Sequence, residues 1–292
     1  MTGFTLLGVP IDSVGRDGGT ELAPAALREL GIADLTDGDA GDVDVRIRGE
    51  FRDPATGILA SDDVLAASAA IRRDVAALLT EGSRPLIAGG CCAELPGALA
   101  AARDVLGRVG LAYLDGHFDL YDGRTSPTGE AADMPVSVAL GFGPEAWTDA
   151  VDGAGVRADD AVLLGPRDLA ASLADGMRDP ASIDGLTAHT NVDLRAAGPR
   201  AVGEATTASL AAGPGRYWVH LDVDVLDELV FPATDYLDPD GLGWDELIDV
   251  LRPLVGSPAT IGASIGCYNP EKDPGRTCGR ALVDAFRDVL AV

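Results

Sequence analysis

Short apolar segments alternate along this chain with longer segments rich in alanine and leucine, and this alternation constrains the fold more than any other feature. The segments of strand length are FTLLGVP (4–10), RPLIAGG (84–90), VGLAYLDGH (109–117), AVLLGP (161–166), RYWVHLDVDV (216–225) and ATIGASIG (259–266). Helical periodicity covers residues 23–32, 61–81, 93–107, 244–254 and 276–290. Strands that alternate with helices are typical of an α/β fold, in which helices cover a parallel sheet.

The length and charge of the chain limit its organisation and its partners. Its 292 residues are 47% hydrophobic, and no linker or repeat divides them, so we expect a single domain over residues 1–292. The pattern is weak only between Gly165 and Gly215. The net charge of -25 would repel phosphates, so we expect neither nucleic acid nor an anionic membrane as a partner. We also expect a cytoplasmic protein, because no segment reaches the roughly 20 apolar residues of a spanning helix and the first residues lack a basic flank.

Polar and sulfur-containing residues gather at the ends of the predicted strands. The sequences AGGCC, LDGHFD, HLDVDV and IGCYNP each finish or follow an apolar segment. Ligands of open α/β sheets bind at the carboxyl ends of the strands, where loops carry polar groups without disturbing the core. We therefore predict that these four segments form the functional site.

Two of these segments have the composition of a metal site. In an extended chain Asp115, His117 and Asp119 point to one face, and so do Asp222 and Asp224. Burying four carboxylates without countercharge would cost several kcal/mol for each ion, and few lysines or arginines lie nearby in the sequence. Carboxylates with a nitrogen ligand suit Mn²⁺, Zn²⁺ or Fe²⁺, and two such ions can generate hydroxide from a shared water. The pattern thus predicts one or two divalent ions.

The same motifs resemble those of a known family, the ureohydrolases, which include arginase and agmatinase. DGHFD and DVDVLD…FPAT are similar to the two metal motifs of that family, and three further segments extend the resemblance over nearly the whole chain: GGTELAPAALRELGI, SPTGEAADMPVSVALG and CYNPEKDPGRTCGRALVDAF. The resemblance implies a three-layer α/β/α fold with a central, mostly parallel sheet. It also implies hydrolysis of C–N bonds in small guanidino-type substrates at a binuclear centre, usually of manganese, in a homo-oligomer.

Transferred residue by residue, the resemblance supplies five metal ligands and leaves a sixth in question. The five are Asp115, His117, Asp119, Asp222 and Asp224. Where the family has GGDH this chain has GGCC, so Cys92 stands in place of a histidine ligand and Cys91 in place of an acidic neighbour. Cys92 could bind the first ion and shift its identity toward Zn²⁺ or Fe²⁺. Alternatively, Cys92 could stay a neutral thiol beside a single remaining ion, or the chain could hold no metal.

Other departures concern the chemistry of the substrate pocket. Ala132 stands where the arginase branch has a proton-shuttling histidine, and Cys267 stands where the family has a glutamate that pairs with the guanidinium. Glu130 and Asp133 could replace the missing acid or base. The cysteines could give thiol-assisted catalysis, or they could only fill space. We therefore expect Asp119 and its neighbours to support hydrolysis of a C–N bond in a small guanidino, amidino or amide-like compound, by an enzyme that differs from a standard arginase or agmatinase. The alternative is an inactive member that binds a ligand or a partner subunit.

Overall fold

The computed structural model describes residues 3–15 and 18–290, and in this part of the chain eight parallel strands form one sheet. The order across the sheet is β2-β1-β3-β8-β7-β4-β5-β6, and every neighbouring pair is parallel. The strands are β1 (Phe4–Val9), β2 (Gly38–Asp42), β3 (Arg84–Gly89), β4 (Gly110–Leu114), β5 (Ala161–Gly165), β6 (Thr187–Thr190), β7 (Tyr217–Asp222) and β8 (Thr260–Gly266). The predicted α/β fold with a parallel sheet is confirmed.

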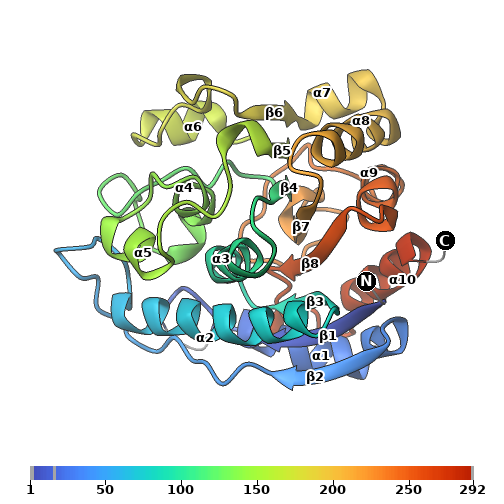
Figure 1. Ribbon diagram of the computed structural model, residues 1–292, viewed down its shortest axis with the longest axis horizontal. Helices are drawn as coiled ribbons and strands as arrows, with labels where there is room; N and C mark the ends of the chain where they lie inside the picture. The colour runs from blue at the N-terminus through green and yellow to red at the C-terminus, as the bar shows by residue number, and fades with distance from the viewer. Residues whose placement is uncertain (1–2, 16–17, 291–292) are drawn as a thin grey trace.

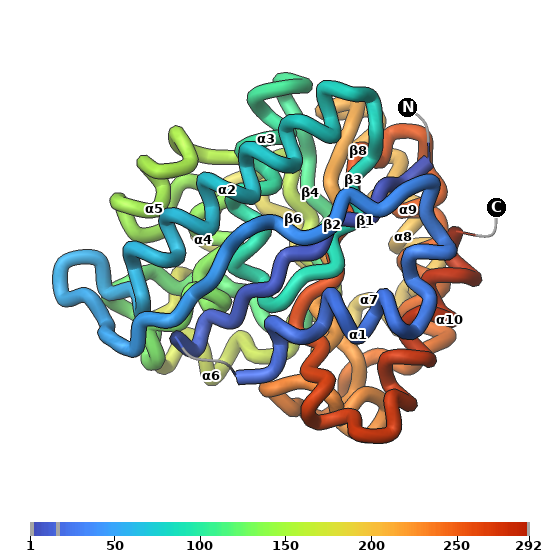
Figure 2. Tube along the Cα trace, turned by 90° about the horizontal axis from the view of Figure 1, so that it is seen from below, coloured from blue at the N-terminus to red at the C-terminus, as the bar shows by residue number. Residues whose placement is uncertain are grey.

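Helices cover both faces of the sheet and produce the three expected layers. Figures 1 and 2 show α2, α3, α4 and α5 on one face and α1, α8, α9 and α10 on the other. The helices are α1 (Ala23–Glu29), α2 (Ser61–Thr80), α3 (Leu95–Leu106), α4 (Pro135–Ala139), α5 (Glu145–Ala150), α6 (Leu169–Ala174), α7 (Asn191–Ala197), α8 (Pro199–Ala212), α9 (Trp244–Gly256) and α10 (Thr277–Leu290).

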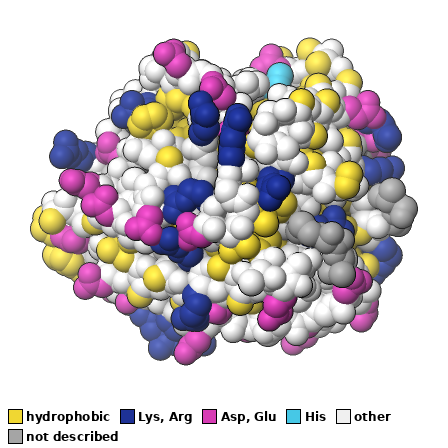
Figure 3. All heavy atoms as spheres, viewed as in Figure 1, with side chains coloured by type: hydrophobic (Ala, Val, Ile, Leu, Met, Phe, Trp, Pro, Cys, Tyr) yellow, Lys and Arg dark blue, Asp and Glu magenta, His cyan; other side chains and the backbone are white. Residues whose placement is uncertain are grey.

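Each face of the sheet has its own apolar core. Trp147 of α5 and Trp218 of β7 belong to the core beneath α2 and α3, whereas Tyr217 of β7 and Phe286 of α10 belong to the opposite core. Because both faces are covered, the central strands are buried along their whole length, which explains their nearly continuous apolar sequences. Charged side chains of both signs are interspersed on the outer face seen in Figure 3.

The segments that the sequence pattern missed are mostly polar or short. Strand β2 is exposed throughout and β6 is at most half-buried, so neither carries the apolar signal of a central strand. Helices α6, α7 and α8 occupy the region of weak pattern. No helix in residues 3–15 and 18–290 is long and apolar enough to cross a membrane.

The four segments predicted to form the site follow strands that are neighbours in the sheet. The central order β3-β8-β7-β4 brings together the chain after Gly89, Gly266, Asp222 and Leu114. Because all four strands run in the same direction, their carboxyl ends lie at one edge.

Candidate metal centre

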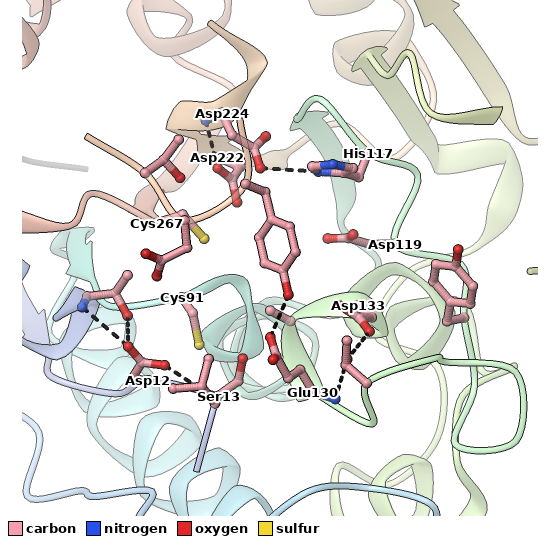
Figure 4. A pocket seen from close by; sticks show the side chains of 18 of the residues that line it. Asp12, Ser13, Cys91, His117, Asp119, Glu130, Asp133, Asp222, Asp224 and Cys267 are labelled. Carbon is pink, nitrogen blue, oxygen red and sulfur yellow. Dashed lines mark hydrogen bonds and ion pairs between the residues drawn. The ribbon is translucent and has the colours of Figure 1, made fainter. Parts of the chain in front are cut away.

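A cavity of about 170 Å³ opens at this edge of the sheet. Figure 4 shows side chains from the four strand ends around the cavity, with Asp222, Asp224 and Cys267 close together, His117 and Asp119 beside them, and Cys91 nearer Asp12. Among the described residues, no lysine or arginine lines the cavity. Its charge is therefore set by carboxylates.

The loop after β4 carries three of the predicted ligands, but it is not extended. Strand β4 ends at Leu114, and Asp119 has a φ of 50°, in the left-handed region that an aspartate adopts only at a local cost. The backbone N–H of His117 donates to Asp115 Oδ1 at 2.6 Å, which curls the loop. Asp115, His117 and Asp119 do lie close together, as predicted. A curled loop brings them together, however, and not the side-chain alternation of an extended strand.

The segment after β7 is also curled. Asp222 is the last residue of β7, and its Oδ1 accepts the backbone N–H of Asp224 at 2.8 Å, at the start of a 3-10 turn over Val223–Val225. Asp224 Oδ1 accepts the N–H of Gly116 at 3.0 Å, which ties this turn to the loop after β4. Arg167 donates to the carbonyl oxygen of Asp224 at 2.7 Å and so helps to hold the turn in place.

The potential ligand atoms at the strand ends form three overlapping groups. Within each group, all the atoms lie within 4.8 Å of one another. One group is Cys92, Asp115 and Asp119, and another is Asp115, His117 and Asp224. A third group contains Cys92, Asp222 and Cys267. The five ligands implied by the resemblance, together with Cys92, are thus brought to one place, and Asp115 is common to two groups.

Cys92 contacts four side chains of the centre and its surroundings. It starts a 3-10 turn after β3 and is buried, with Sγ 2.8 Å from Asp222 Oδ2, 3.9 Å from Asp115 Oδ2 and 3.7 Å from Cys267 Sγ. On its other side, His220 Nε2 lies 3.1 Å from the same sulfur. Cys92 and His220 are both buried, and neither is among the residues that line the cavity.

Burial and repulsion shift the carboxylates of the centre toward their protonated forms. Burial, with a contribution from Asp224, raises the pKa of Asp115 to about 6. Burial and neighbouring carboxylates likewise raise the pKa values of Asp119 and Asp222 well above their usual range. The protein alone therefore offers these carboxylates little compensating positive charge.

His117 supplies part of that charge. Burial by itself would lower the pKa of His117, but the carboxylates of Asp224, Asp115 and Asp238 raise it well above its usual value. Burial likewise acts to raise the pKa of Asp224, but the opposing effect of His117 prevails and lowers it. His117 Nδ1 lies 3.1 Å from Asp224 Oδ2, and its Nε2 lies 3.1 Å from Asp238 Oδ2. A cation bound at the centre would supply the positive charge that protonated His117 supplies in its absence.

The thiols do not have the environment of a reactive thiolate. Burial raises the pKa of Cys92 well above its usual value, and the contacts with Cys267 and Asp222 add to the effect. The hydrogen bond from Cys92 acts to lower the pKa of Cys267, but burial and Asp222 leave it well above its usual value. Burial raises the pKa of Cys91 as well. The lowered pKa that thiol-assisted catalysis would require is therefore not found without a cation.

The remaining predicted pocket residues line the cavity. Glu130, half-buried, accepts a hydrogen bond from Tyr236 through Oε2 at 2.9 Å. Asp133 Oδ2 accepts from Ser126 and Thr128, each at 2.7 Å, so this oxygen already has two hydrogen-bond donors. Ala132 and Cys91 also line the cavity, but Cys91 belongs to none of the ligand groups.

Several residues at the centre were missed by the sequence analysis. Asp12 and Asp235 line the cavity, Asp238 contacts His117, and the Tyr113 hydroxyl donates to Asp119. Asp12 follows β1, so the rule that polar groups gather at strand ends could have found it. Asp235 and Asp238 lie in a loop without regular structure, and no spacing in the sequence distinguishes them from other acidic loop residues.

Comparison with known proteins assigns the chain to a family. The sequence model described as the Arginase family matches residues 2–291. An arginase from Brevibacillus brevis is 28% identical over 98% of this chain and 97% of its own length. Among solved structures, an arginase from Bacillus subtilis has a TM-score of 0.89 at 23% identity, covering 100% of this chain and 99% of that one. A formimidoylglutamase from Bacillus subtilis has a TM-score of 0.77 at 20% identity, covering 100% and 87%. The chain belongs to the arginase family.

Proposed function

We propose that this protein is a metal-dependent hydrolase that cleaves a C–N bond in a small amidino, guanidino or amide-like compound, and that it is not a standard arginase or agmatinase. The observation that carries the proposal is that His117, Asp119, Asp222 and Asp224 line one cavity, with Asp115 in the ligand groups beside them. A buried cluster of this kind costs free energy unless it is neutralised, and a divalent cation neutralises it best.

The donor set fits divalent ions at two overlapping positions. Cys92, Asp115 and Asp119 would hold one ion, and Asp115, His117 and Asp224 would hold the other, with Asp222 beside both Cys92 and Asp224. Such ions, when bound, lower the pKa of water and supply a hydroxide at neutral pH. Carboxylate and imidazole donors accept Mn²⁺, whereas the thiol of Cys92 favours Zn²⁺ or Fe²⁺.

The residues around the ions would orient the ligands and the substrate. The Tyr113 hydroxyl fixes Asp119, Arg167 fixes the turn that carries Asp224, and Asp238 fixes the ring of His117. Such partners hold ligands in one orientation and strengthen metal binding. Glu130 is the candidate for proton transfer, because Oε2 accepts from Tyr236 and burial raises the pKa of its carboxyl above the usual value.

The lining of the cavity restricts the substrate. Asp12, Glu130, Asp133 and Asp235 line the cavity, and no lysine or arginine is among its described lining residues, so an anionic group would be repelled there. Cys267 occupies the place where the resemblance implies a carboxylate facing a guanidinium, and Ala132 cannot transfer a proton. These two departures favour a substrate other than arginine or agmatine.

The test combines metal content with a substrate screen. Purified protein would be reconstituted with Mn²⁺, Zn²⁺, Co²⁺ or Fe²⁺, its metal content measured by mass spectrometry, and ammonia, urea or formamide release followed on guanidino, amidino, formimidoyl and amide compounds. We expect one or two ions per chain and metal-dependent turnover of one compound class. Bound metal with no turnover would favour a ligand-binding member of the family. Protein that holds no metal would overturn the proposal.

The family resemblance also supports a homo-oligomer that acts in the cytoplasm. Light scattering coupled to size-exclusion chromatography would measure the first property, since a mass of one chain would contradict it.

A further inference from the structure

Two cysteines from adjacent strands lie side by side at the centre. Cys92 follows β3 and Cys267 follows β8, and these strands pair directly, with Ala88 opposite Ile265. Their Sγ atoms are 3.7 Å apart. The neighbouring Asp222 completes a group whose ligand atoms all lie within 4.8 Å of one another.

The backbone of Cys267 is held in an unfavourable conformation at this point. Its φ is 66°, in the left-handed region, which is unfavourable for a residue that carries a side chain. The Cys267 N–H donates to the carbonyl oxygen of Gly90 at 2.7 Å, which binds the loop after β8 to the loop that carries Cys92. The sheet therefore fixes the two thiols relative to each other.

The spacing of the sulfurs matches that of two thiolates on one ion. With Zn–S bonds of about 2.3 Å and tetrahedral angles, two ligating sulfurs lie about 3.8 Å apart. The observed 3.7 Å requires almost no movement of either cysteine. Asp222 Oδ2 lies 2.8 Å from Cys92 Sγ, and this contact would open by less than 1 Å to about 3.5 Å when both atoms bind zinc.

His220 provides a hydrogen bond that suits a thiolate. Ser264 Oγ accepts from Trp218 Nε1 at 3.1 Å, so its own proton is available to His220 Nδ1 at 2.7 Å. That arrangement places the imidazole proton on Nε2, 3.1 Å from Cys92 Sγ. A buried N–H that faces a metal-bound sulfur offsets part of its negative charge.

We propose that Cys267 is a metal ligand together with Cys92 and Asp222, so that this end of the centre binds a thiophilic ion, Zn²⁺ or Co²⁺, in preference to Mn²⁺. The inference rests on the proposed metal centre and changes its composition, because Cys267 and Asp222 take the place of Asp115 and Asp119 as the partners of Cys92. Three protein ligands leave a fourth position for water or substrate, as in catalytic zinc sites. The opposite end, with Asp115, His117 and Asp224, keeps only oxygen and nitrogen donors. On ion binding both thiols lose their protons to solvent, and no bond between the sulfurs forms.

Cobalt absorption tests this assignment directly. Metal-free, reduced protein would be titrated with Co²⁺, and sulfur-to-cobalt charge transfer in the near ultraviolet would be recorded for the wild type, Cys92→Ser, Cys267→Ser and Cys278→Ser. Cys278 lies on α10 outside the ligand groups and is the matched control. We expect the band to fall by about half in each of the first two variants and to stay unchanged in the control. Competition with equimolar Zn²⁺ and Mn²⁺ should show at least a tenfold loss of zinc preference in Cys267→Ser.

The outcomes separate this inference from the proposed function. Cobalt that binds Cys267→Ser with an undiminished band would overturn the role of Cys267 and leave the metal centre in place. Failure of the wild type to bind any ion would overturn both proposals. A loss of two free thiols in protein purified without reductant, restored by reductant and absent in Cys267→Ser, would show a Cys92–Cys267 disulfide and would also contradict the assignment. Circular dichroism of each variant would verify that it is folded.

Discussion

At the scale of the residue, the protonation of Cys92 is linked to the binding of metal at the proposed centre. Cys92 Sγ contacts a carboxylate, an imidazole and a second thiol, and none of them can hold it as a thiolate unaided. Burial lowers the pKa of His220 to about 3, so this imidazole stays neutral and gives no positive charge. The thiol therefore stays protonated until a cation displaces the proton, which ties the chemistry of Cys92 to metal binding.

Replacing Cys92 by histidine should change which ion binds. The Cys92→His variant exchanges a soft ligand for imidazole, so we expect its affinity for Mn²⁺ to rise by about tenfold, equivalent to about 1.4 kcal/mol, relative to Zn²⁺. Competitive dialysis with metal analysis measures this ratio. Cys91→Ser, one residue away and outside the ligand groups, is the control and should keep the wild-type ratio. Unchanged metal content and identity in Cys92→His would mean that Cys92 is not a ligand.

Glu130 should matter for turnover more than for binding. Glu130→Gln keeps the shape and the hydrogen bond from Tyr236 but cannot transfer a proton, so we expect kcat to fall by about 10²-fold with little change in KM. The pH–rate profile should also lose the limb that reports the raised pKa of Glu130. Asp133→Asn serves as the comparison, because Ser126 and Thr128 already engage Asp133. A larger loss of kcat in Asp133→Asn than in Glu130→Gln would mean that Asp133, and not Glu130, transfers the proton.

At the scale of the element, strand order explains why distant motifs meet. The central strands are buried on both faces and could be predicted from their apolar sequences, and so could the edge where their loops gather. The edge strands β2 and β6 could not, because exposed residues such as Asp39 and Thr187 carry no burial signal. The curl of residues 115–119 combines a local hydrogen bond, from His117 to Asp115, with one from Gly116 to Asp224 across 108 residues, and the second could not be predicted from the sequence.

The contact between β7 and β8 leaves no room for a side chain at Gly262. A Cβ built there would lie 2.3 Å from a ring carbon of Trp218, whose ring is buried and donates to Ser264. We expect Gly262→Ala to lower the free energy of unfolding by about 1–3 kcal/mol, measured by urea denaturation. Gly38→Ala on the exposed strand β2 is the control, because its Cβ would meet no atom closer than 3.9 Å. Equal stability of the two variants would contradict the packing at Trp218.

At the scale of the whole molecule, the stability of the fold depends on the protons bound at the centre and, in the proposed function, on its metal ions. The folded chain raises the pKa values of Asp115, Asp222 and His117, so at these three groups the metal-free folded state binds more protons than the unfolded state. The stability that they contribute therefore falls as the pH rises, while His220, whose pKa is lowered to about 3, acts in the opposite direction below about pH 6.5. For Asp115 this fall occurs between about pH 4 and pH 6, and for His117 it continues above about pH 6.5. A bound divalent ion removes the need for these protons.

Metal should accordingly reverse the pH dependence of thermal stability. We expect the Tm of protein treated with a chelator to decrease between about pH 6.5 and pH 8, where His220 no longer opposes the effect of His117, and the rise in Tm caused by saturating Zn²⁺ or Mn²⁺ to grow over the same range, because each proton displaced adds about 1.4 kcal/mol of binding free energy per pH unit. Differential scanning calorimetry at several pH values measures both trends. The double variant Asp115→Asn, His117→Asn should lose most of the slope and most of the metal response. A metal-induced rise in Tm that stays constant with pH would mean that the ion binds without displacing protons, and therefore binds somewhere other than this centre.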